Sequence, residues 1–591
     1  MLHTRSFCAT AAALLATAGI GFSQPGIPSP AEPMPAVLRN YQAVTADRLK
    51  NPEDGNWLSI RRTYDGWGYS PLDQITADNV KNLRPVWIFS TGETKVHESA
   101  PLVNNGVMFV STPNNQVIAL DVRTGNLLWR YKRPRPAGAV VAHDTSRGVA
   151  LYGDKVYFAA GEAVLVALDA RTGKEVWTTK VADSKAAYYI TLAPLIAGGK
   201  VMVGASGGEF GIRGFVAAFD PDTGKEQWRT YTIPAPGEPG SETWPKGGNQ
   251  WKTGGGPVWV TGNYDPATNL AYWGVGNGGP WIGDKRPGDN LYVASTIALD
   301  VSTGAIKGYF QYNPNESWDW DEVSPPILVD FERGGRTFKG LIDVARDGYL
   351  WFLDRGDATT GGRIKFIEGK PYVYQNVFRG LDPETGRPDV DPAHKPGTGK
   401  EADFCPELHG GKNWPPIAFS PKTRMIYIPA NNNMCSGTTG IEMEYSPGKG
   451  FTGVKFEPNS IVPGADHFGE VQAWNVDTGK QVWRHDYAKS PNWGSMLVTG
   501  GGVVFSGGTN DRKIHAFDAT TGKLLWEFPT NSGILAPPTS FTVDGKQYIA
   551  VHAGWGGDSR GVQANLNRAF PGEYPEVPEG GAVWVFALPQ E

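Results

Sequence analysis

The sequence predicts an all-β protein, an eight-bladed β-propeller with four-stranded blades, on two observations. The first is a repeated segment, and the second is a strand-like run at the C-terminus, Ala582–Leu588 (AVWVFAL). Copies recur at about four dozen residues, the length of one propeller blade, so the chain has room for about eight. The copies are Val117–Trp129, Val166–Trp177, Val216–Trp228, Val471–Trp483 and Ile514–Trp526, with a weaker one at Ile297–Tyr309.

Each copy consists of two strand-like runs joined by an Asp/Asn-x-x-Thr-Gly turn. The glycine supplies the positive φ that the turn needs, and the Asp and Thr side chains bond turn amides. The second run ends in an aromatic residue, which we expect to dock between adjacent blades and bury a large area. These docking residues are Trp129, Trp177, Trp228, Trp483 and Trp526. Packing therefore explains much of the tryptophan content without any functional role.

Further strand-like runs between the copies complete the predicted blades. They are Gly106–Val110, Lys155–Ala159, Lys200–Gly204 and Gly502–Ser506. The C-terminal run is expected to pair with the N-terminal blade, because ring closure removes exposed sheet edges. Two segments without the repeat, Pro314–Pro326 and Gly356–Gly411, are expected to be loops over one face, where functional groups concentrate.

The N-terminal residues have the pattern of a secretory signal. Arg5 precedes an apolar stretch, Ala9–Phe22, that is short and Ala-rich for a membrane span, and small residues predict cleavage after Ser23. We therefore expect a signal peptide at residues 1–23, a single propeller domain at 24–591 and a periplasmic location, with a membrane anchor as the alternative. No later stretch resembles a transmembrane segment, so we expect no membrane span after cleavage.

Cysteine content and charge exclude several classes of protein. After cleavage Cys405 and Cys435 would be the only cysteines, and in an oxidising compartment they most simply form one disulfide. Two thiols are too few for a structural zinc site, and the absence of Cys-x-x-Cys-His excludes a built-in c-type haem. The net charge of −5, with no basic block, argues against a nucleic-acid partner.

Polar residues outside the repeat indicate a bound metal and an anionic cofactor. Arg147 and Arg346 suit an anionic ligand rich in carbonyl groups, and Trp259, after three glycines, can lie against a flat ring. These residues are far apart in sequence and meet only if the fold is radial. An oxygen-ligand set suited to a hard cation such as Ca²⁺ comprises Glu209, Asn277, Asp319 and Asp321.

At these residues the sequence resembles the soluble PQQ-dependent quinoprotein alcohol dehydrogenases, the methanol/ethanol dehydrogenase family, where PQQ is pyrroloquinoline quinone. The resemblance extends from Asn56–Trp87 (NWLSIRRTYDGWGYSPLDQITADNVKNLRPVW) to the final AVWVFALP. The family fold is an eight-bladed propeller with PQQ and a metal ion near its axis. The resemblance implies PQQ contacts from Glu98, Arg147, Thr191, Ser206, Gly207, Gly208, Trp259, Arg346, Asn413 and Trp493.

The resemblance also implies the other roles at the site. The metal ligands would be Glu209, Asn277, Asp319 and Asp321, and a structural disulfide would join Cys405 and Cys435. Asp319 would be the catalytic base that takes the alcohol proton, while the carbinol hydride moves to PQQ and the metal acts as Lewis acid. Arg346 would be the second catalytic residue and would stabilise charge on the quinone oxygens.

Three positions depart from the pattern of the family. Val141 and Ala142 stand where many members have two adjacent cysteines, so the PQQ face opposite Trp259 must be covered differently. Pro257 replaces a polar residue close to Trp259. Asp321 resembles the additional carboxylate of lanthanide-using members. The missing cysteine pair, however, points to a different subgroup, so we expect Ca²⁺, with a lanthanide as the alternative.

The sequence thus predicts a periplasmic PQQ- and metal-dependent dehydrogenase that oxidises an alcohol to the carbonyl. In lacking the cysteine pair and in its elaborated segment Gly356–Gly411, the sequence resembles subgroups that oxidise bulky secondary alcohols such as deoxynivalenol, or alternatively sugars such as sorbose. His409 and Trp414 either line the substrate mouth or pack the loop. Electrons would pass to a separate cytochrome c or another periplasmic acceptor. A non-enzymatic exported propeller scaffold is the alternative from another class, although it has no need of the Glu209/Asn277/Asp319 set.

Overall fold

The computed structural model describes residues 34–589, and β-sheets dominate this part of the chain. Its α-helices are α1 (Ala36–Arg39), α2 (Ala46–Lys50) and α3 (Asp558–Ala569). The described residues form eight sheets of four or five strands, together with three smaller sheets. The all-β prediction is therefore confirmed. The predicted signal peptide lies outside the described residues.

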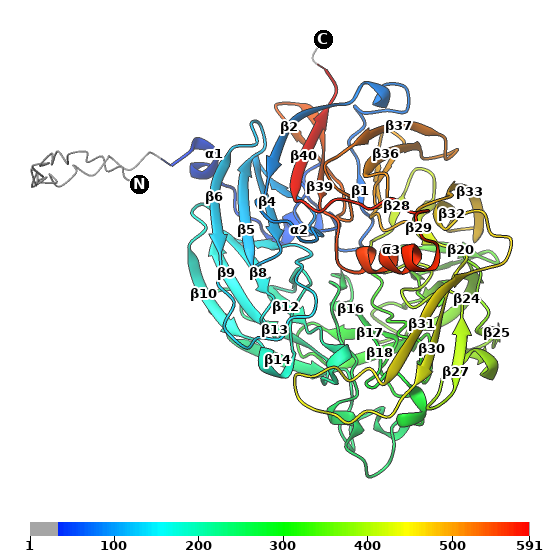
Figure 1. Cartoon of the computed structure of the whole chain (residues 1–591). Coiled ribbons are helices and arrows are strands. Elements are labelled where there is room, and N and C mark those ends of the chain that lie inside the picture. Colours follow the sequence, from blue (N-terminus) through cyan, green and yellow to red (C-terminus); the bar gives the residue numbers. More distant parts are fainter. Residues whose placement is uncertain (1–33, 590–591) are drawn as a thin grey trace, which may run out of the picture.

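Four sheets follow one another through the first half of the chain, and their strands succeed each other in sequence order. In Figure 1 they occupy the blue, cyan and green parts of the molecule in turn. The strands are β3 (Leu102–Asn104), β4 (Val107–Thr112), β5 (Gln116–Asp121) and β6 (Leu127–Lys132); β7 (Ala150–Tyr152), β8 (Lys155–Ala160), β9 (Val164–Asp169) and β10 (Glu175–Lys180); β11 (Leu195–Ala197), β12 (Lys200–Gly204), β13 (Phe215–Phe219) and β14 (Glu226–Tyr231); and β15 (Asn263–Asp265), β16 (Leu270–Val275), β17 (Ser295–Asp300) and β18 (Ile306–Gln311).

The second half of the chain supplies four more sheets, and two of them also take a strand from near the N-terminus. Figure 1 shows them continuing round the molecule through green and yellow to orange and red. The strands are β19 (Ile327–Leu328), β22 (Gly340–Val344), β23 (Tyr349–Asp354) and β24 (Lys365–Pro371); β28 (Ala418–Ser420), β29 (Met425–Asn431), β32 (Gly469–Asn475) and β33 (Lys480–Tyr487); β1 (Tyr69–Ser70), β34 (Leu497–Thr499), β35 (Val503–Ser506), β36 (Lys513–Asp518) and β37 (Leu524–Pro529); and β2 (Arg84–Ser90), β38 (Thr539–Val543), β39 (Lys546–Ala553) and β40 (Ala582–Ala587).

The predicted loop at Gly356–Gly411 contains strands, so this prediction was wrong in part. Besides β24, the segment holds a two-stranded hairpin and one strand of a three-stranded sheet. Its Asp382–Gly386 turn is another Asp-x-x-Thr-Gly turn, in which Asp382 Oδ1 accepts hydrogen bonds from the N–H and hydroxyl of Thr385. The strands of the smaller sheets are β20 (Phe331–Arg333) and β21 (Arg336–Phe338); β25 (Phe378–Leu381) and β26 (Pro388–Val390); and β27 (Glu401–Phe404), β30 (Met434–Gly440) and β31 (Val454–Ile461).

The C-terminal strand joins the two ends of the fold, as the sequence predicted. β40 pairs antiparallel with β2 from Arg84↔Ala587 to Ser90↔Ala582 and with β39 on its other side. In Figure 1 the red β40 lies beside the blue β2. The last sheet therefore contains strands from both ends of the chain.

Burial decreases toward the outer strand of a sheet. All six residues of β4 are buried, whereas exposed and half-buried positions alternate along β2 and much of β6. A strand covered on both faces must be apolar throughout, and a strand near the surface needs only one apolar face. The inner strands thus supply a continuous core.

The repeat tryptophans contact the turn of the following sheet. Trp129 Nε1 donates to the carbonyl of Ala170 at 3.0 Å, and Gly173 lies against the indole face. A Cβ added to Gly173 would be 2.5 Å from a ring carbon, so the turn needs a glycine there. Equivalent bonds run from Trp177 to Pro221, from Trp228 to Val301 and from Trp483 to Ala519.

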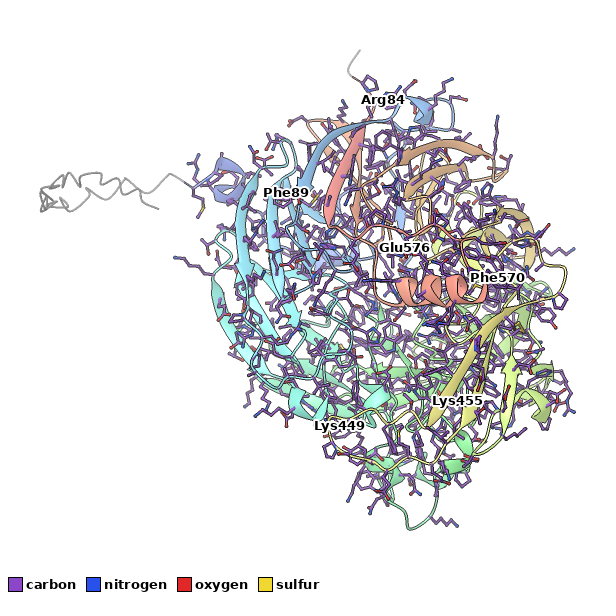
Figure 2. The ribbon with its side chains drawn as sticks, viewed as in Figure 1. Arg84, Phe89, Lys449, Lys455, Phe570 and Glu576 are labelled. Carbon is purple, nitrogen blue, oxygen red and sulfur yellow. A yellow bond between two sulfur atoms is a disulfide. The ribbon has the colours of Figure 1, made fainter. Side chains whose placement is uncertain are left out.

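Covalent and surface features complete the fold. Cys405 and Cys435 form the predicted disulfide, with a Cα–Cα distance of 4.3 Å. Within residues 34–589, no helix has both the length and the apolar character that a membrane crossing requires. Helix α3 lies across the face turned to the viewer in Figure 1, and Figure 2 shows Phe570 directly after its end.

Candidate active site

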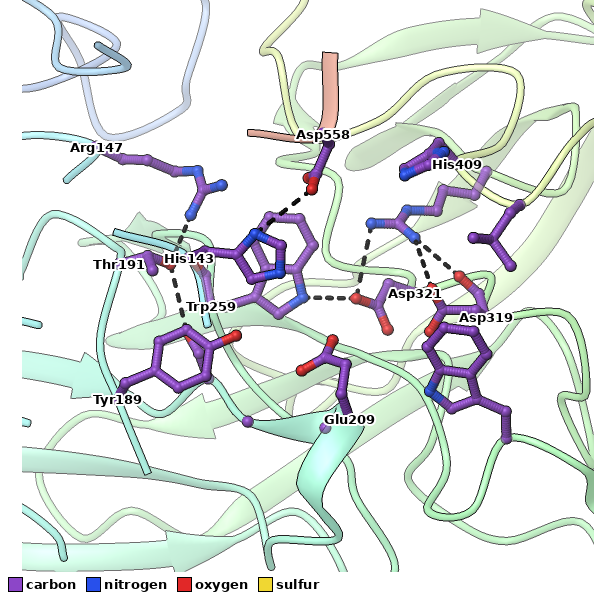
Figure 3. A pocket seen from close by; sticks show the side chains of 16 residues that line it. His143, Arg147, Tyr189, Thr191, Glu209, Trp259, Asp319, Asp321, His409 and Asp558 are labelled. Atoms are coloured by element: carbon purple, nitrogen blue, oxygen red, sulfur yellow. Dashed lines mark hydrogen bonds and ion pairs between the residues drawn. The ribbon is translucent and has the colours of Figure 1, made fainter. Parts of the chain in front are cut away.

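One cavity collects residues from loops that join successive sheets and from loops that join strands within a sheet. The loops after β6, β10, β12, β14, β18 and β22 all contribute, so residues far apart in sequence meet, as a radial fold requires. Figure 3 shows the polar side chains converging on this space. The lining residues are His143, Arg147, Tyr189, Thr191, Ser206, Gly207, Gly208, Glu209, Trp259, Trp281, Asp319, Asp321, Arg346, Leu408, His409 and Asp558.

Two carboxylates of one cavity wall, Asp321 and Glu209, lie beside Trp259 and Asn277. Asp321 Oδ2 accepts a hydrogen bond from Trp259 Nε1 at 2.6 Å, and Asp321 Oδ1 accepts one from the backbone N–H of Asn277. Glu209 lies in a 3-10 turn, Gly208–Phe210. A Cβ added to Gly208 would lie 2.1 Å from Asn277 Oδ1, so this glycine lets the Glu209 turn approach Asn277 closely.

Arg346 lies between the two aspartates. Its Nη1 is 4.0 Å from Asp319 Oδ2, and its Nη2 is 3.7 Å from Asp321 Oδ2. Burial and the charge of Asp321 raise the pKa of Asp319 well above its ordinary value, although Arg346 opposes this. Burial raises the pKa of Asp321 to about 6, with Arg346 opposing and Glu209 adding to the rise. The acidic groups are therefore incompletely neutralised by Arg346, and a cation would stabilise their charged forms.

Several polar atoms around the cavity are buried without a hydrogen-bond partner among the described residues. They include Glu209 Oε2 and Asp319 Oδ1 on the acidic wall, and Arg346 Nε and Arg147 Nε on the basic side. Buried polar groups in proteins are nearly always paired, so unpaired ones indicate a ligand. The oxygen atoms fit a hard cation, and the guanidinium groups fit an anionic or carbonyl-bearing molecule.

Arg147 is held by four neighbours. Its Nη1 donates to Thr191 Oγ1 at 2.5 Å, and its Nη2 is 3.1 Å from Glu98 Oε2. The guanidinium carbon lies 4.7 Å from the ring centroid of Trp259 and 4.8 Å from that of Trp414. This arrangement fixes a positive charge beside the face of Trp259, where a flat anionic ligand could contact both.

Four predicted site residues lie behind the cavity wall rather than on it. Glu98 contacts Arg147, and Asn277 contacts Asp321, as described above. Asn413 Nδ2 donates to the carbonyl of His409 at 3.1 Å, and the ring of Trp493 lies 5.6 Å from that of His409. His409 itself lines the cavity, whereas Trp414 packs against Arg147.

Three polar lining residues were absent from the sequence prediction. His143 follows the Val141–Ala142 pair, and its ring stacks on Tyr189 with centroids 6.3 Å apart. Asp558, the first residue of α3, faces His143, with 3.5 Å between Asp558 Oδ1 and His143 Nδ1. The Val141–Ala142 pair, which departs from the family pattern, lies in the same loop as His143. No sequence motif, however, distinguishes His143, Tyr189 or Asp558.

Comparisons with known proteins agree with this site. A sequence model described as "PQQ: Glucose/ethanol/alcohol dehydrogenase, beta-propeller domain" matches residues 57–378 and 487–549. The chain is 39% identical to the quinoprotein alcohol dehydrogenase PedH of Pseudomonas putida, over 92% of both chains. It is 35% identical to a quinoprotein ethanol dehydrogenase of Pseudomonas aeruginosa, over 88% of both chains.

Solved structures show the same likeness. A europium-containing methanol dehydrogenase superposes with a TM-score of 0.85 at 36% identity, covering 92% of this chain and 100% of the other. The quinohemoprotein alcohol dehydrogenase of Comamonas testosteroni gives 0.83 at 34% identity, covering 94% and 84%. The propeller-type fold is thereby confirmed. The chain belongs to the PQQ-dependent quinoprotein alcohol dehydrogenases and is an oxidoreductase acting on alcohols.

Proposed function

We propose that this protein oxidises an alcohol to the carbonyl at the cavity between Trp259 and Asp319, using PQQ and one bound metal ion. The proposal rests on two buried oxygens without hydrogen-bond partners, Glu209 Oε2 and Asp319 Oδ1. Both residues line the same cavity as Arg346. A structural propeller has no need of such carboxylates gathered with two arginines and a tryptophan ring in one cavity. An alcohol-oxidising site needs a base, a cation and a cofactor-binding wall together.

The residues of this chain would divide the work between binding and proton transfer. Arg147, Thr191 and the Ser206–Gly208 segment hold an anionic ring system, and Trp259 offers it a flat apolar face. Asn413 and Trp493 support the opposite rim through His409. When bound, PQQ supplies the two-electron acceptor and the metal supplies Lewis acidity.

Asp319 takes the proton from the substrate hydroxyl as the carbinol carbon gives up a hydride. Its raised pKa favours the protonated carboxyl, which cannot accept a proton, and a cation beside it would lower that pKa and favour the carboxylate. Arg346 donates to the carbonyl of Asp319 at 2.8 Å, which holds the guanidinium in the cavity, where it would stabilise negative charge on a bound acceptor. Metal binding and the protonation state of Asp319 are thus coupled.

The proposed metal ligands are Glu209, Asn277, Asp319 and Asp321. Ca²⁺ and a trivalent lanthanide both prefer such oxygen donors. Asp321 provides a third carboxylate, which favours a trivalent ion on Coulombic grounds, and the related europium-containing enzyme supports this alternative to the expected Ca²⁺.

The remaining features of the proposal come from the sequence. We propose a signal peptide at residues 1–23, a periplasmic location and transfer of electrons to a separate cytochrome c or another acceptor. The substrate would be a bulky secondary alcohol such as deoxynivalenol, or alternatively a sugar such as sorbose. We further propose that the eight larger sheets are the blades of one propeller, at residues 24–591, and that the Trp contacts described above dock neighbouring blades.

A reconstitution experiment tests the proposal. The apoprotein is mixed with PQQ and either Ca²⁺ or La³⁺, and dye reduction is followed with primary alcohols, bulky secondary alcohols and sugars. We expect activity only when PQQ and a metal are both present, and a fall of about 10²- to 10⁴-fold in Asp319→Asn. Asp73→Asn, at an exposed position, is the matched control and should behave as wild type. Lack of PQQ binding and of turnover with every substrate would contradict the proposal.

A further inference from the structure

The cavity has a second polar wall opposite the acidic one. It consists of His143, His409 and Asp558, which come from three separate parts of the chain. Figure 3 shows Asp558 entering from α3, with His143 and His409 on its two sides. The proposed chemistry assigns no role to this wall, which we call the α3 wall.

Asp558 carries a charge that its surroundings maintain. Burial alone would raise the pKa of this carboxyl, but His143, His409, Arg147 and Arg346 outweigh it and hold the pKa below its ordinary value. The Asp558 side chain is 22% exposed, which leaves part of the carboxylate open to the cavity. An ionised carboxylate beside two imidazoles offers both hydrogen-bond acceptors and donors to a ligand.

The fold makes little use of this carboxylate. Helix α3 begins after Gly557, and no side chain caps its N-terminus by a hydrogen bond. Asp558 has one ion-pair partner within residues 34–589, His143, whose side chain is itself 40% exposed. On the far side, His409 is oriented by Glu407, whose carboxylate oxygens both lie 3.1 Å from His409 Nδ1. His409 Nε2 and much of the Asp558 carboxylate therefore remain available.

We propose that Asp558 is a specificity-determining residue whose carboxylate, flanked by the imidazoles of His143 and His409, binds a second hydroxyl group of the substrate. The preferred substrates are accordingly alcohols that carry another hydroxyl group, such as diols and polyols, rather than simple alkanols. The inference rests on the proposed oxidation at Asp319, because both aspartates line the same cavity. Trp281 and Leu408 supply apolar lining for the carbon skeleton between the two hydroxyl groups.

The test compares matched substrates that differ by one hydroxyl group. Values of kcat/KM are measured for 1-butanol against butane-1,2-, 1,3- and 1,4-diol, and for cyclohexanol against the cyclohexanediols. We expect wild type to favour at least one diol, and Asp558→Ala to lower that diol-to-alkanol ratio by about 10- to 100-fold, the effect of losing a hydrogen bond to a charged group. Asp558→Asn, of the same shape, should lower it less. His409→Phe should also lower it, and Asp73→Asn should leave it unchanged.

The ratio separates specificity from folding and from the proposed function. Loss of folded protein lowers both rates equally and leaves the ratio unchanged, and Asp558→Asn carries the test if the alanine variant does not fold. A wild-type enzyme that turns over alcohols but shows the same ratio as Asp558→Ala and Asp558→Asn overturns the inference alone. A wild-type protein that turns over no alcohol with PQQ and metal overturns the proposed function instead.

Discussion

Asp319 adopts a backbone conformation that few residues other than glycine adopt, with φ of 63°. Asp tolerates the left-handed region better than most residues, and such conformations concentrate at functional sites. Here the conformation accompanies a buried Oδ1 without a partner and a main-chain carbonyl that accepts from Arg346. Both the side chain and the main chain of one residue thus contribute to the site.

Arg346 should be irreplaceable by lysine. The planar guanidinium reaches towards both Asp319 and Asp321 and also donates to the Asp319 carbonyl, whereas an ammonium group is a single point charge. We expect Arg346→Lys to lower kcat about 100-fold at saturating PQQ, metal and alcohol. Arg336→Lys, at an exposed position, is the control. A kcat of Arg346→Lys within threefold of wild type would show that the fork geometry is unimportant.

The acidic wall was predictable from sequence, and the α3 wall was not. Glu209, Asp319 and Arg346 stand in long ordered motifs, so a family resemblance could place them before their distances were known. His143 and Asp558 are single residues in loops without periodicity. Their approach to 3.5 Å depends on where the first residue of α3 meets the cavity, which the tertiary structure determines.

The repeated turn joins two strands of one sheet and also packs against the Trp of the preceding sheet. Its glycine has a positive φ, 68° at Gly173, and presents its open face to the indole of the preceding sheet. Gly173 therefore meets both the need for a positive φ and the need for space beside the indole. A glycine that has a positive φ but no neighbouring side chain separates the two effects.

Gly173→Ala should destabilise the protein more than Gly153→Ala. Both glycines have positive φ, but no atom lies within 4 Å of a Cβ added to Gly153, whereas one would lie 2.5 Å from Trp129 at Gly173. Strain alone costs about 1–2 kcal/mol, and overpacking adds about 1–3 kcal/mol. Urea unfolding of the two variants measures the difference. Equal losses of unfolding free energy would show that the Trp129 contact contributes nothing.

Sequence reasoning also failed at one element, the segment Gly356–Gly411. Its turn at Asp382–Gly386 has the repeat's Asp-x-x-Thr-Gly pattern but is followed by a short strand without a terminal Trp. The segment is therefore not a complete copy of the repeat. Gly386 nonetheless packs against the ring of Phe366, so a different aromatic residue takes the place of Trp in this contact.

The whole molecule depends on the joining of its two ends. Close to the β2–β40 pair, His97 contacts residues near the C-terminus. Its backbone N–H donates to the carbonyl of Gly554, and its ring leaves no room for a Cβ at Gly581. The His552 ring lies 4.7 Å away. This buried histidine pair thus connects the N-terminal region with the last sheet.

Stability should fall as the pH falls below about 6.5. Burial lowers the pKa of His97 to about 4, so at pH 5 the unfolded chain binds a proton that the native state does not. The expected loss between pH 7 and pH 5 is about 2 kcal/mol from His97, and His552, whose pKa is also lowered, adds to it. Urea unfolding at both pH values should show a smaller loss in His97→Gln. Equal losses in the variant and wild type would exclude His97 as the cause.

At the scale of the whole chain, we propose that loops from sheets along the whole sequence assemble one PQQ- and metal-binding site that oxidises an alcohol. The most direct measurement is the absorption spectrum of PQQ in the reconstituted protein, recorded without any electron acceptor before and after addition of alcohol. We predict that bound PQQ is reduced once, with one carbonyl product formed per PQQ, and that Asp319→Asn binds PQQ but does not reduce it. PQQ that fails to bind, or that binds and stays oxidised in wild type with every alcohol tested, would contradict the account.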